Sequence, residues 1–220
     1  MGQRLFSGLR LHVKQRIALG VAMLVVSFGY LPINRAMSGG ATVEIWLDQL
    51  MPFWAIWIVP YLLAIAWWLV AGAWALLKME DPLWLAFVSS WILACLIGFM
   101  IFILYPTYMV RPDSTGSGWA ESLVAHVYAN DRTHNAFPSM HLWSTVTITL
   151  YWSNWKPKWR MWLWTATILV ALSTVLSGQH WILDVVGGTL LAALCYYLGP
   201  LLVASVCPIR RRQPSSRAGG

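Results

Sequence analysis

The sequence predicts an all-α, polytopic integral membrane protein, and three observations point to this fold class. Of the 220 residues, 59% are hydrophobic and only 10% are charged, whereas soluble domains carry about a quarter charged residues. The chain contains 16 Trp and 8 Tyr residues, and these amphipathic rings collect at membrane–water interfaces. Apolar runs long enough to span a bilayer also recur along the whole chain.

Six of these runs predict six transmembrane helices packed in one bundle, since a spanning helix needs about 20 apolar residues. No linker or low-complexity block divides the chain, so we expect a single membrane domain over residues 17–206. The first run also resembles a signal peptide, because basic residues precede it and small residues follow it. We favour an uncleaved helix, since an even number of spans fits the charge distribution. The predicted spans are residues 17–34, 52–77, 83–106, 138–154, 161–178 and 182–206.

Both ends of the chain are basic and are expected to lie outside the bundle, in the cytoplasm. Residues 1–16 are predicted to form a basic amphipathic helix on the membrane surface. Residues 207–220 form a basic tail. The side chains of the first segment that are expected to face lipid are Leu5, Phe6, Leu9 and Val13.

The distribution of charge predicts the topology. With both termini in the cytoplasm, the inner side carries 12 of the 15 Lys and Arg residues, and the outer side carries only Arg35, Arg111 and Arg132. Such an asymmetry orients membrane proteins with the basic side inward. Because the basic residues lie in short clusters between apolar runs, the net charge of +7 does not indicate a nucleic-acid partner. The short chain and small loops are typical of prokaryotic proteins, so the outer side is expected to face the periplasm or the exterior of a plasma membrane.

Polar residues from three separate segments meet at this outer boundary. Arg111 follows the third predicted span in "YPTYMVRPD", and "FPSMH" places Ser139 and His141 at the start of the fourth. The segment "STVLSGQHWILD" places His180 and Asp184 between the fifth and the sixth. The longest polar loop, residues 107–137, connects the first two of these segments, and its "ESLVAHVY" portion predicts a short interfacial helix.

The residue types and spacings favour phosphoryl-transfer chemistry. Pro138 suits the first position of a helix, and the free N–H groups that follow it are a natural site for an anion. His180 and Asp184 are four residues apart and share one face of a helix. A carboxylate at this spacing can orient an imidazole and stabilise its positive form. Asp48, before the second span, is expected to cap that helix.

These segments resemble the three motifs of the type 2 phosphatidic acid phosphatase superfamily, K-x6-R-P, P-S-G-H and S-R-x5-H-x3-D. "LYPTYMVRP" matches the first except that Leu104 occupies the lysine position. "PSMH" matches the second with Met140 in place of glycine, and "STVLSGQHWILD" matches the third with Thr174 in place of arginine. The motifs cover residues 104–188, and the six-helix layout extends the resemblance over most of the chain.

The resemblance implies a covalent mechanism without a metal ion or another cofactor. His180 is expected to attack phosphorus and form a phosphohistidine, with Asp184 orienting its ring. His141 is expected to protonate the leaving alcohol and then to activate water or an acceptor alcohol. The groups expected to bind the phosphoryl oxygens are Arg111, Ser139, the backbone at Met140, and Ser173.

The two missing cations favour a substrate with less negative charge. A phosphomonoester carries nearly two negative charges at neutral pH, whereas a phosphodiester carries one. Loose Lys and Arg positions, together with "DQLMPFW" at residues 48–54, resemble the branch that includes inositol phosphorylceramide synthase and sphingomyelin synthase. The resemblance therefore favours a phosphotransferase that acts on a phosphodiester lipid, with an alcohol or a lipid as acceptor. Alternatively, Arg132 replaces a missing cation from the long loop, which weakens this inference.

Two other functions remain as alternatives. The first is a simple phosphatase of phosphatidic acid or an isoprenoid phosphate. The second is a non-catalytic lipid-binding or transport protein that kept the fold. A transporter is expected to have polar residues deep in several helices, and the first three predicted spans have almost none.

Overall fold

The computed structural model describes residues 5–6, 8–112 and 116–206 and is helical throughout, with two isolated β-bridges but no strand in this part of the chain. Five of the described helices are long and apolar enough to cross a membrane, which confirms an all-α fold with several candidate spans. The predicted basic tail, residues 207–220, lies outside the described residues. The five candidate spans are Val13–Ala36, Ala55–Lys78, Asp81–Leu104, Pro157–Leu176 and Ile182–Ser205.

The first candidate span consists of α2 (Val13–Phe28) and α3 (Tyr30–Ala36). The chain passes close to α5 between them, because a Cβ on Gly29 would lie 3.0 Å from the ring of Phe99. Of the predicted surface helix over residues 1–16, residues 8–12 are not helical, and residues 13–16 belong to α2. Phe6 is fully buried against the core instead of facing lipid. Residues 1–4 and 7 lie outside the described residues.

An antiparallel pair of long helices, α4 (Ile58–Lys78) and α5 (Asp81–Leu104), continues the bundle. Arg16 of α2 stabilises the tight turn between α4 and α5. Its guanidinium group forms an ion pair with Asp81 and donates hydrogen bonds to the carbonyl groups of residues 75, 76 and 79. These carbonyl groups lie at and just after the C-terminal end of α4, so a cation is favourable there.

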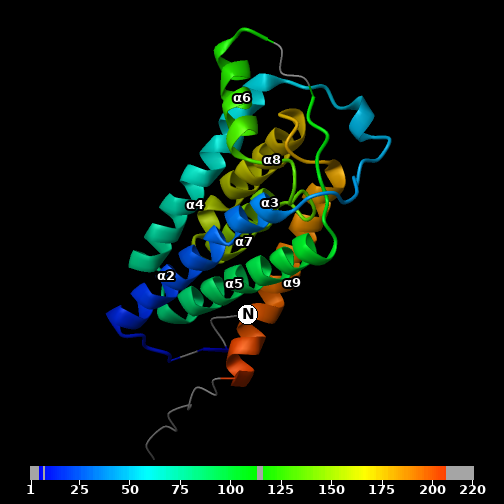
Figure 1. Ribbon diagram of the computed structural model, residues 1–220. Helices are drawn as coiled ribbons and strands as arrows, with labels where there is room; N and C mark the ends of the chain where they lie inside the picture. The colour runs from blue at the N-terminus through cyan, green and yellow to red at the C-terminus, as the bar shows by residue number, and fades with distance from the viewer. Residues whose placement is uncertain (1–4, 7, 113–115, 207–220) are drawn as a thin grey trace, which may run out of the picture.

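The predicted interfacial helix in the long loop is confirmed as α6 (Trp119–Asn130). Figure 1 shows α6 at the end of the bundle that lies opposite the start of α2 and the end of α9. Short 3-10 turns, η1 (Asp48–Leu50) and η2 (Ala55–Trp57), lie in and after the loop that precedes α4. The contact between α6 and η2 shows that the loop before α4 and the long loop lie at the same end of the molecule.

The centre of the molecule is α7 (Met140–Trp155), which packs against α4, α5, α8 and α9. Eleven of its 16 residues are buried, and several of these carry hydroxyl groups that bond to neighbouring helices or to the helix backbone. Thr145 accepts a hydrogen bond from Trp68, and Thr149 bonds to Thr167. With 16 residues, α7 is too short to count among the five candidate spans.

The last two helices are α8 (Arg160–Leu176), which follows the turn η3 (Pro157–Trp159), and α9 (Ile182–Val206). The start of α7 lies directly on α9 because two glycines leave room for it. A Cβ on Gly188 would clash with the carbonyl group of Ser139, and one on Gly187 would clash with the ring of Phe137. This close approach brings the second and third sequence motifs together.

Candidate active site

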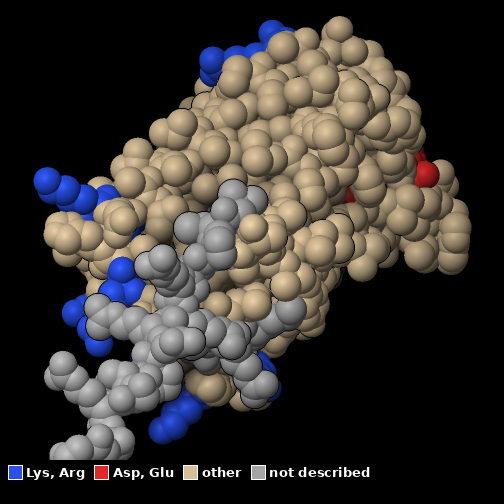
Figure 2. All heavy atoms as spheres, turned by 90° about the horizontal axis from the view of Figure 1, so that it is seen from below, with Lys and Arg blue, Asp and Glu red and all other residues tan. Residues whose placement is uncertain are grey.

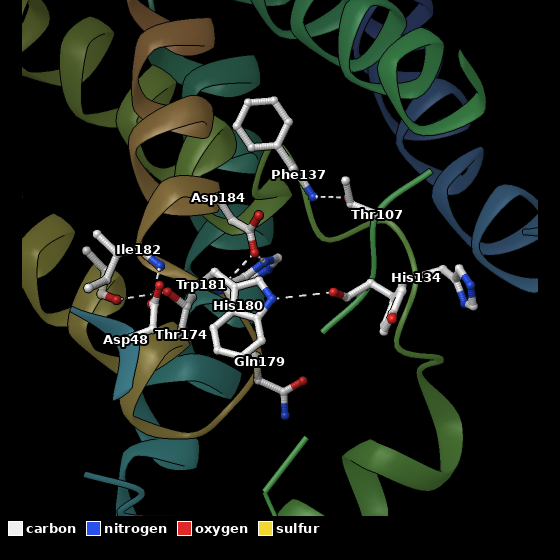
Figure 3. A network of polar contacts seen from close by, with 12 residues as sticks. Asp48, Thr107, His134, Phe137, Thr174, Gln179, His180, Trp181, Ile182 and Asp184 are labelled. Carbon is white, nitrogen blue, oxygen red and sulfur yellow. Dashed lines mark hydrogen bonds and ion pairs between the residues drawn. The ribbon is translucent and has the colours of Figure 1, made fainter. Parts of the chain in front are cut away.

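His180 lies in the tight turn between α8 and α9, and its side chain faces a buried carboxylate. Its Nδ1 lies 3.3 Å from Oδ2 of Asp184, which is fully buried. The same carboxylate oxygen accepts a hydrogen bond from the backbone N–H of Trp181. The carbonyl group of Thr174 binds the backbone N–H groups of residues 179 and 180 and thereby shapes the turn. With Nδ1 directed at the carboxylate (Figure 3), Nε2 is the nitrogen available for chemistry.

His141 is the second residue of α7 and faces His180. The centroids of the two imidazole rings are 5.9 Å apart. Tyr61 of α4 stacks on His141 at a centroid distance of 4.1 Å, and Trp68 lies against it at 5.0 Å. The Nε2 atom of His141 is buried and has no protein partner. Two aromatic side chains therefore orient a histidine whose reactive nitrogen is free to bind a ligand.

The start of α7 joins the same site through Ser139. Its backbone N–H donates to the carbonyl group of Asp184 at 2.9 Å, which ties the two helices together at the site. The hydroxyl group of Ser139 is fully buried and has no hydrogen-bond partner. Met140 follows as the first residue of α7, where backbone N–H groups lack partners within the helix.

Arg111 lines the small polar pocket that also contains His180. Its Nη1 donates to the backbone carbonyl groups of Tyr128 and Asp131, at 3.1 and 2.7 Å, and its guanidinium carbon lies 4.4 Å from the centre of the Tyr128 ring. Nη2 contacts Oε1 of Gln179 and the carbonyl group of Arg132, each at 3.4 Å, and Nε has no partner among the described residues. The side chain is thus held in place by α6 while part of its donor capacity stays available.

Several buried polar atoms around His180 therefore have no partner among the residues that the structure describes. Buried polar groups in proteins are normally paired, so a group of unpaired donors indicates a place where a ligand binds. Donors of this kind suit an anion with several acceptor oxygens, such as a phosphoryl group. The unpaired donor atoms are Nε of Arg111, Oγ of Ser139, Nε2 of Gln179 and, when protonated, Nε2 of His141; Oδ1 of Asp184 and Oδ1 of Asn135 are unpaired acceptors beside them.

A large apolar cavity of about 350 Å³ opens onto both histidines. One wall comes from the junction of α2 and α3, including Phe28 and Leu31, and the other comes from α4, including Leu62 and Ile65. Residues at the C-terminal end of α6 also line this cavity. A cavity of this size and character is suited to hydrocarbon.

A second, more polar cavity of about 220 Å³ lies on the loop side of His180 and is lined by Arg111, Trp181 and Asp48, among others. Asp48 does not cap the second candidate span, as was predicted, but binds the start of α9. Its Oδ1 accepts a hydrogen bond from the N–H of Ile182 and its Oδ2 one from the N–H of Ile45, both at 2.8 Å. Figure 3 shows the bond between Asp48 and Ile182 beside His180.

We expect Asp48→Ala to destabilise the protein, because two buried N–H groups lose their acceptor. Each such loss costs about 1–3 kcal/mol, and His180 lies only two residues before Ile182, so activity should fall as well. Thermal unfolding in detergent measures the first effect. Asp48→Asn retains one acceptor oxygen and serves as the control, with a smaller expected loss. An unchanged melting temperature in Asp48→Ala would contradict this role.

The remaining predicted residues lie differently. The hydroxyl group of Ser173 donates to the carbonyl group of Val170 within α8, and Ser173 lines none of the cavities around His180. Arg132 lies at the rim of the site, but its Nη1 donates to the carbonyl group of Arg35. The side chain of Leu104 is 75% exposed at the end of α5.

Sequence reasoning missed three residues of the site, Gln179, Tyr61 and Asp131. Gln179 directly precedes His180, and its position is the only signal that the sequence offered. Tyr61 lies within an apolar run, and Asp131 lies in a polar loop with two other acidic residues. Only the folded structure brings these two side chains to the histidines.

The comparisons with known proteins agree with the motifs. Among the described residues, no group of three or more His, Cys, Asp or Glu side chains has the arrangement of a metal site. The comparison with curated proteins found no match. Residues 106–205, which include Arg111, both histidines and Asp184, match the family model described as the PAP2 superfamily.

Proposed function

We propose that the protein is a membrane enzyme that cleaves or transfers the phosphoryl group of a lipid phosphate ester through a phosphohistidine. The observation that carries this proposal is the His180–Asp184 pair, which faces His141 at the inner end of a large apolar cavity. Proteins of the PAP2 superfamily are phosphatases and phosphotransferases, and the matched residues contain this site. Residues 17–206 form the proposed catalytic domain.

In the first step, Nε2 of His180 attacks phosphorus, and the bond from phosphorus to the lipid alcohol breaks. Protonated His141 donates its proton to the leaving oxygen. The carboxylate of Asp184 stabilises the positive charge that develops on the His180 ring. In the second step, neutral His141 removes a proton from water or an acceptor alcohol, whose oxygen attacks phosphorus while the N–P bond breaks.

The unpaired donors around His180 are proposed to bind the phosphoryl oxygens. Arg111 and Ser139 supply side-chain donors, and the start of α7 at Met140 supplies backbone N–H groups and the positive end of a helix dipole. These groups stabilise the charge that builds up in the transition state. Ser173 has no part in this proposal, because its hydroxyl group is bound within α8.

The proposed orientation places this site at the outer boundary of the membrane. In this topology α7 is a sixth, short span within the bundle, and both termini are cytoplasmic. Figure 2 shows Lys and Arg side chains around the face near the chain ends, as expected for an inner side. The lipid would enter sideways between α2 and α4, in the plasma membrane of a prokaryote, with its phosphate at the periplasmic or exterior boundary.

Transfer from a phosphodiester lipid is the preferred reaction within this proposal. Arg111 lines the polar pocket that contains His180 and has an unpaired Nε, whereas the guanidinium group of Arg132 binds the Arg35 carbonyl group. Thr174, at the position of a family cation, donates its hydroxyl hydrogen to the carbonyl group of Ala171. A site with little positive charge suits the single charge of a diester better than the nearly double charge of a monoester.

Lipid mass spectrometry on the purified protein tests the proposal, with His180→Ala as the blank. One sample receives phosphatidic acid, and another receives phosphodiester lipids with and without an alcohol or lipid acceptor. Movement of the phosphoryl head group to the acceptor supports transfer, and loss of phosphate from phosphatidic acid supports the simple phosphatase. If no ester is consumed above the blank, the enzymatic proposal is wrong and a lipid-binding role takes its place.

The apolar cavity gives a more specific prediction for the lipid tail. We expect Ile65→Trp, which fills the cavity, to lower kcat/KM for a long-chain lipid by about tenfold, because at least two methylene groups lose their burial. Short-chain, water-soluble phosphate esters should be unaffected. Leu63→Trp is the matched control, since Leu63 is 61% exposed on α4 and does not line the cavity. Equal effects on short and long chains would contradict this assignment of the cavity.

A further inference from the structure

A carboxyl group that belongs to none of the three motifs lies at the junction between the apolar cavity and the phosphate-binding donors. Asp131 directly follows α6 and lines both the large apolar cavity and the small polar pocket that contains Arg111 and His180. Its two carboxylate oxygens lie 3.1 and 3.3 Å from the hydroxyl group of Tyr30. An incoming phosphate ester would have to pass this carboxyl group.

The charge of Asp131 is not cancelled by the nearby arginine. Nη1 of Arg111 binds the backbone carbonyl group of Asp131, and no ion pair between the two side chains is formed within the described residues. The other titratable groups that face Asp131 are Tyr61 of α4, Tyr128 of α6 and His180 of the turn between α8 and α9. Arg111 is thus a positive charge that acts on this carboxyl group and is shared with the phosphate site.

The protonation state of this carboxyl group responds to pH more readily than that of a surface aspartate. Burial raises the pKa of Asp131 above its usual value, while Arg111, the Tyr30 hydroxyl group and His180 oppose this effect. A raised pKa means that the carboxyl group loses its negative charge as the pH falls toward that pKa. The negative charge next to the phosphate site is therefore present at high pH and removed at low pH.

We propose that Asp131 is a specificity-determining residue that discriminates against doubly charged phosphate esters and favours singly charged ones. This inference depends on the proposed function, because it assigns a substrate preference to the same site. When ionised, Asp131 repels a dianionic monoester more strongly than a monoanionic diester. The carboxyl group thereby offsets part of the attraction that Arg111 offers to either ester.

The direct test measures kcat/KM for phosphatidic acid and for a diester lipid with the same acyl chains. At pH 8, Asp131→Asn is expected to raise the monoester-to-diester ratio by about tenfold or more, since two unit charges about 12 Å apart at an effective dielectric constant of about 20 interact by this amount and closer charges by more. Glu121→Gln is the charge-matched control, because it removes an acidic charge from α6 at a position that lines none of the cavities around His180. Its ratio should equal that of the wild type.

The pH dependence adds a second readout that a purely structural role would not produce. A phosphomonoester itself takes up a proton near pH 6, so the wild type and Asp131→Asn must be compared at each pH. Their ratios should differ at pH 8 and converge as the pH falls, because the raised pKa of Asp131 lets it lose its charge at a higher pH than an ordinary aspartate. A difference that stays constant as the pH falls, or no difference at pH 8, would overturn the proposal.

Tyr30→Phe keeps the test valid if Asp131→Asn fails to fold. Without the hydroxyl donor the pKa of Asp131 rises further, so the pH at which monoester turnover becomes favourable should move upward. If the pH dependence of the monoester-to-diester ratio is the same as in the wild type, the proposed role of Asp131 is wrong. Failure of the proposed function looks different, because the wild type would then match His180→Ala on every ester. Turnover by the wild type, with the same ester ratio in Asp131→Asn, would eliminate only the role of Asp131.

Discussion

Replacing His180 with glutamine is expected to lower turnover of every phosphate ester by about 10⁴-fold or more, as for the nucleophile of other covalent enzymes. Gln cannot form the N–P bond, and it cannot share a proton with Asp184. The fold should survive, because the side chain of His180 packs into no core cluster and is hydrogen-bonded only to Asp184. Phosphate release or lipid mass spectrometry measures the loss.

His141→Gln separates the two histidines by their roles. With a nitrophenyl phosphate ester, the leaving group needs no proton, so His180 should still be phosphorylated. The second step lacks its base, and a labelled phosphoprotein should accumulate that is stable in alkali and labile in acid. His180→Gln should give no labelled protein. Wild-type turnover in both variants, or label on another residue, would contradict the assigned roles.

The second large effect is expected from Asp184→Asn, which should lower kcat by about 10²–10⁴-fold with a smaller change in KM. In the related arrangement of an aspartate behind a catalytic histidine, the amide leaves the geometry intact but favours the wrong imidazole tautomer. The amide oxygen can still accept the N–H of Trp181, so the melting temperature should change little.

Asp184→Ala is the informative partner of this variant. It removes the acceptor of the Trp181 N–H in a fully buried place, which costs about 1–3 kcal/mol of unfolding free energy. Activity should fall at least as far as in Asp184→Asn, but with a clear loss of stability. Full activity in Asp184→Asn would show that Asp184 only supports the turn.

The proposed orientation stays a prediction that rests on the sequence, because charge asymmetry acts through the membrane and not through packing. The sequence likewise predicted most helices, since apolar runs of about 20 residues have few other stable states in a bilayer. The N-terminal segment was the exception. Phe6 has the same hydrophobicity whether it faces lipid or protein, and only packing against the core decided its place.

The spacing of His180 and Asp184 within one helical turn made their pairing predictable from the sequence alone. Local geometry determines contacts between residues four apart. The contact of His141 with His180 followed only from the motif order, and its distance depends on Gly187 and Gly188, which admit the start of α7. The two glycines alone do not predict which helix packs against them.

By itself, the sequence determined the all-helical membrane character, the His180–Asp184 pair and the segments that supply Arg111, Ser139 and His141. Tertiary structure alone decided that Asp48 binds the start of α9 and that Ser173 turns away from the site. It also decided that Asp131 stands beside Tyr30, a neighbour 101 positions away along the chain. Hydropathy and short spacings are local properties, whereas these contacts join distant segments whose approach depends on how side chains of the whole bundle pack.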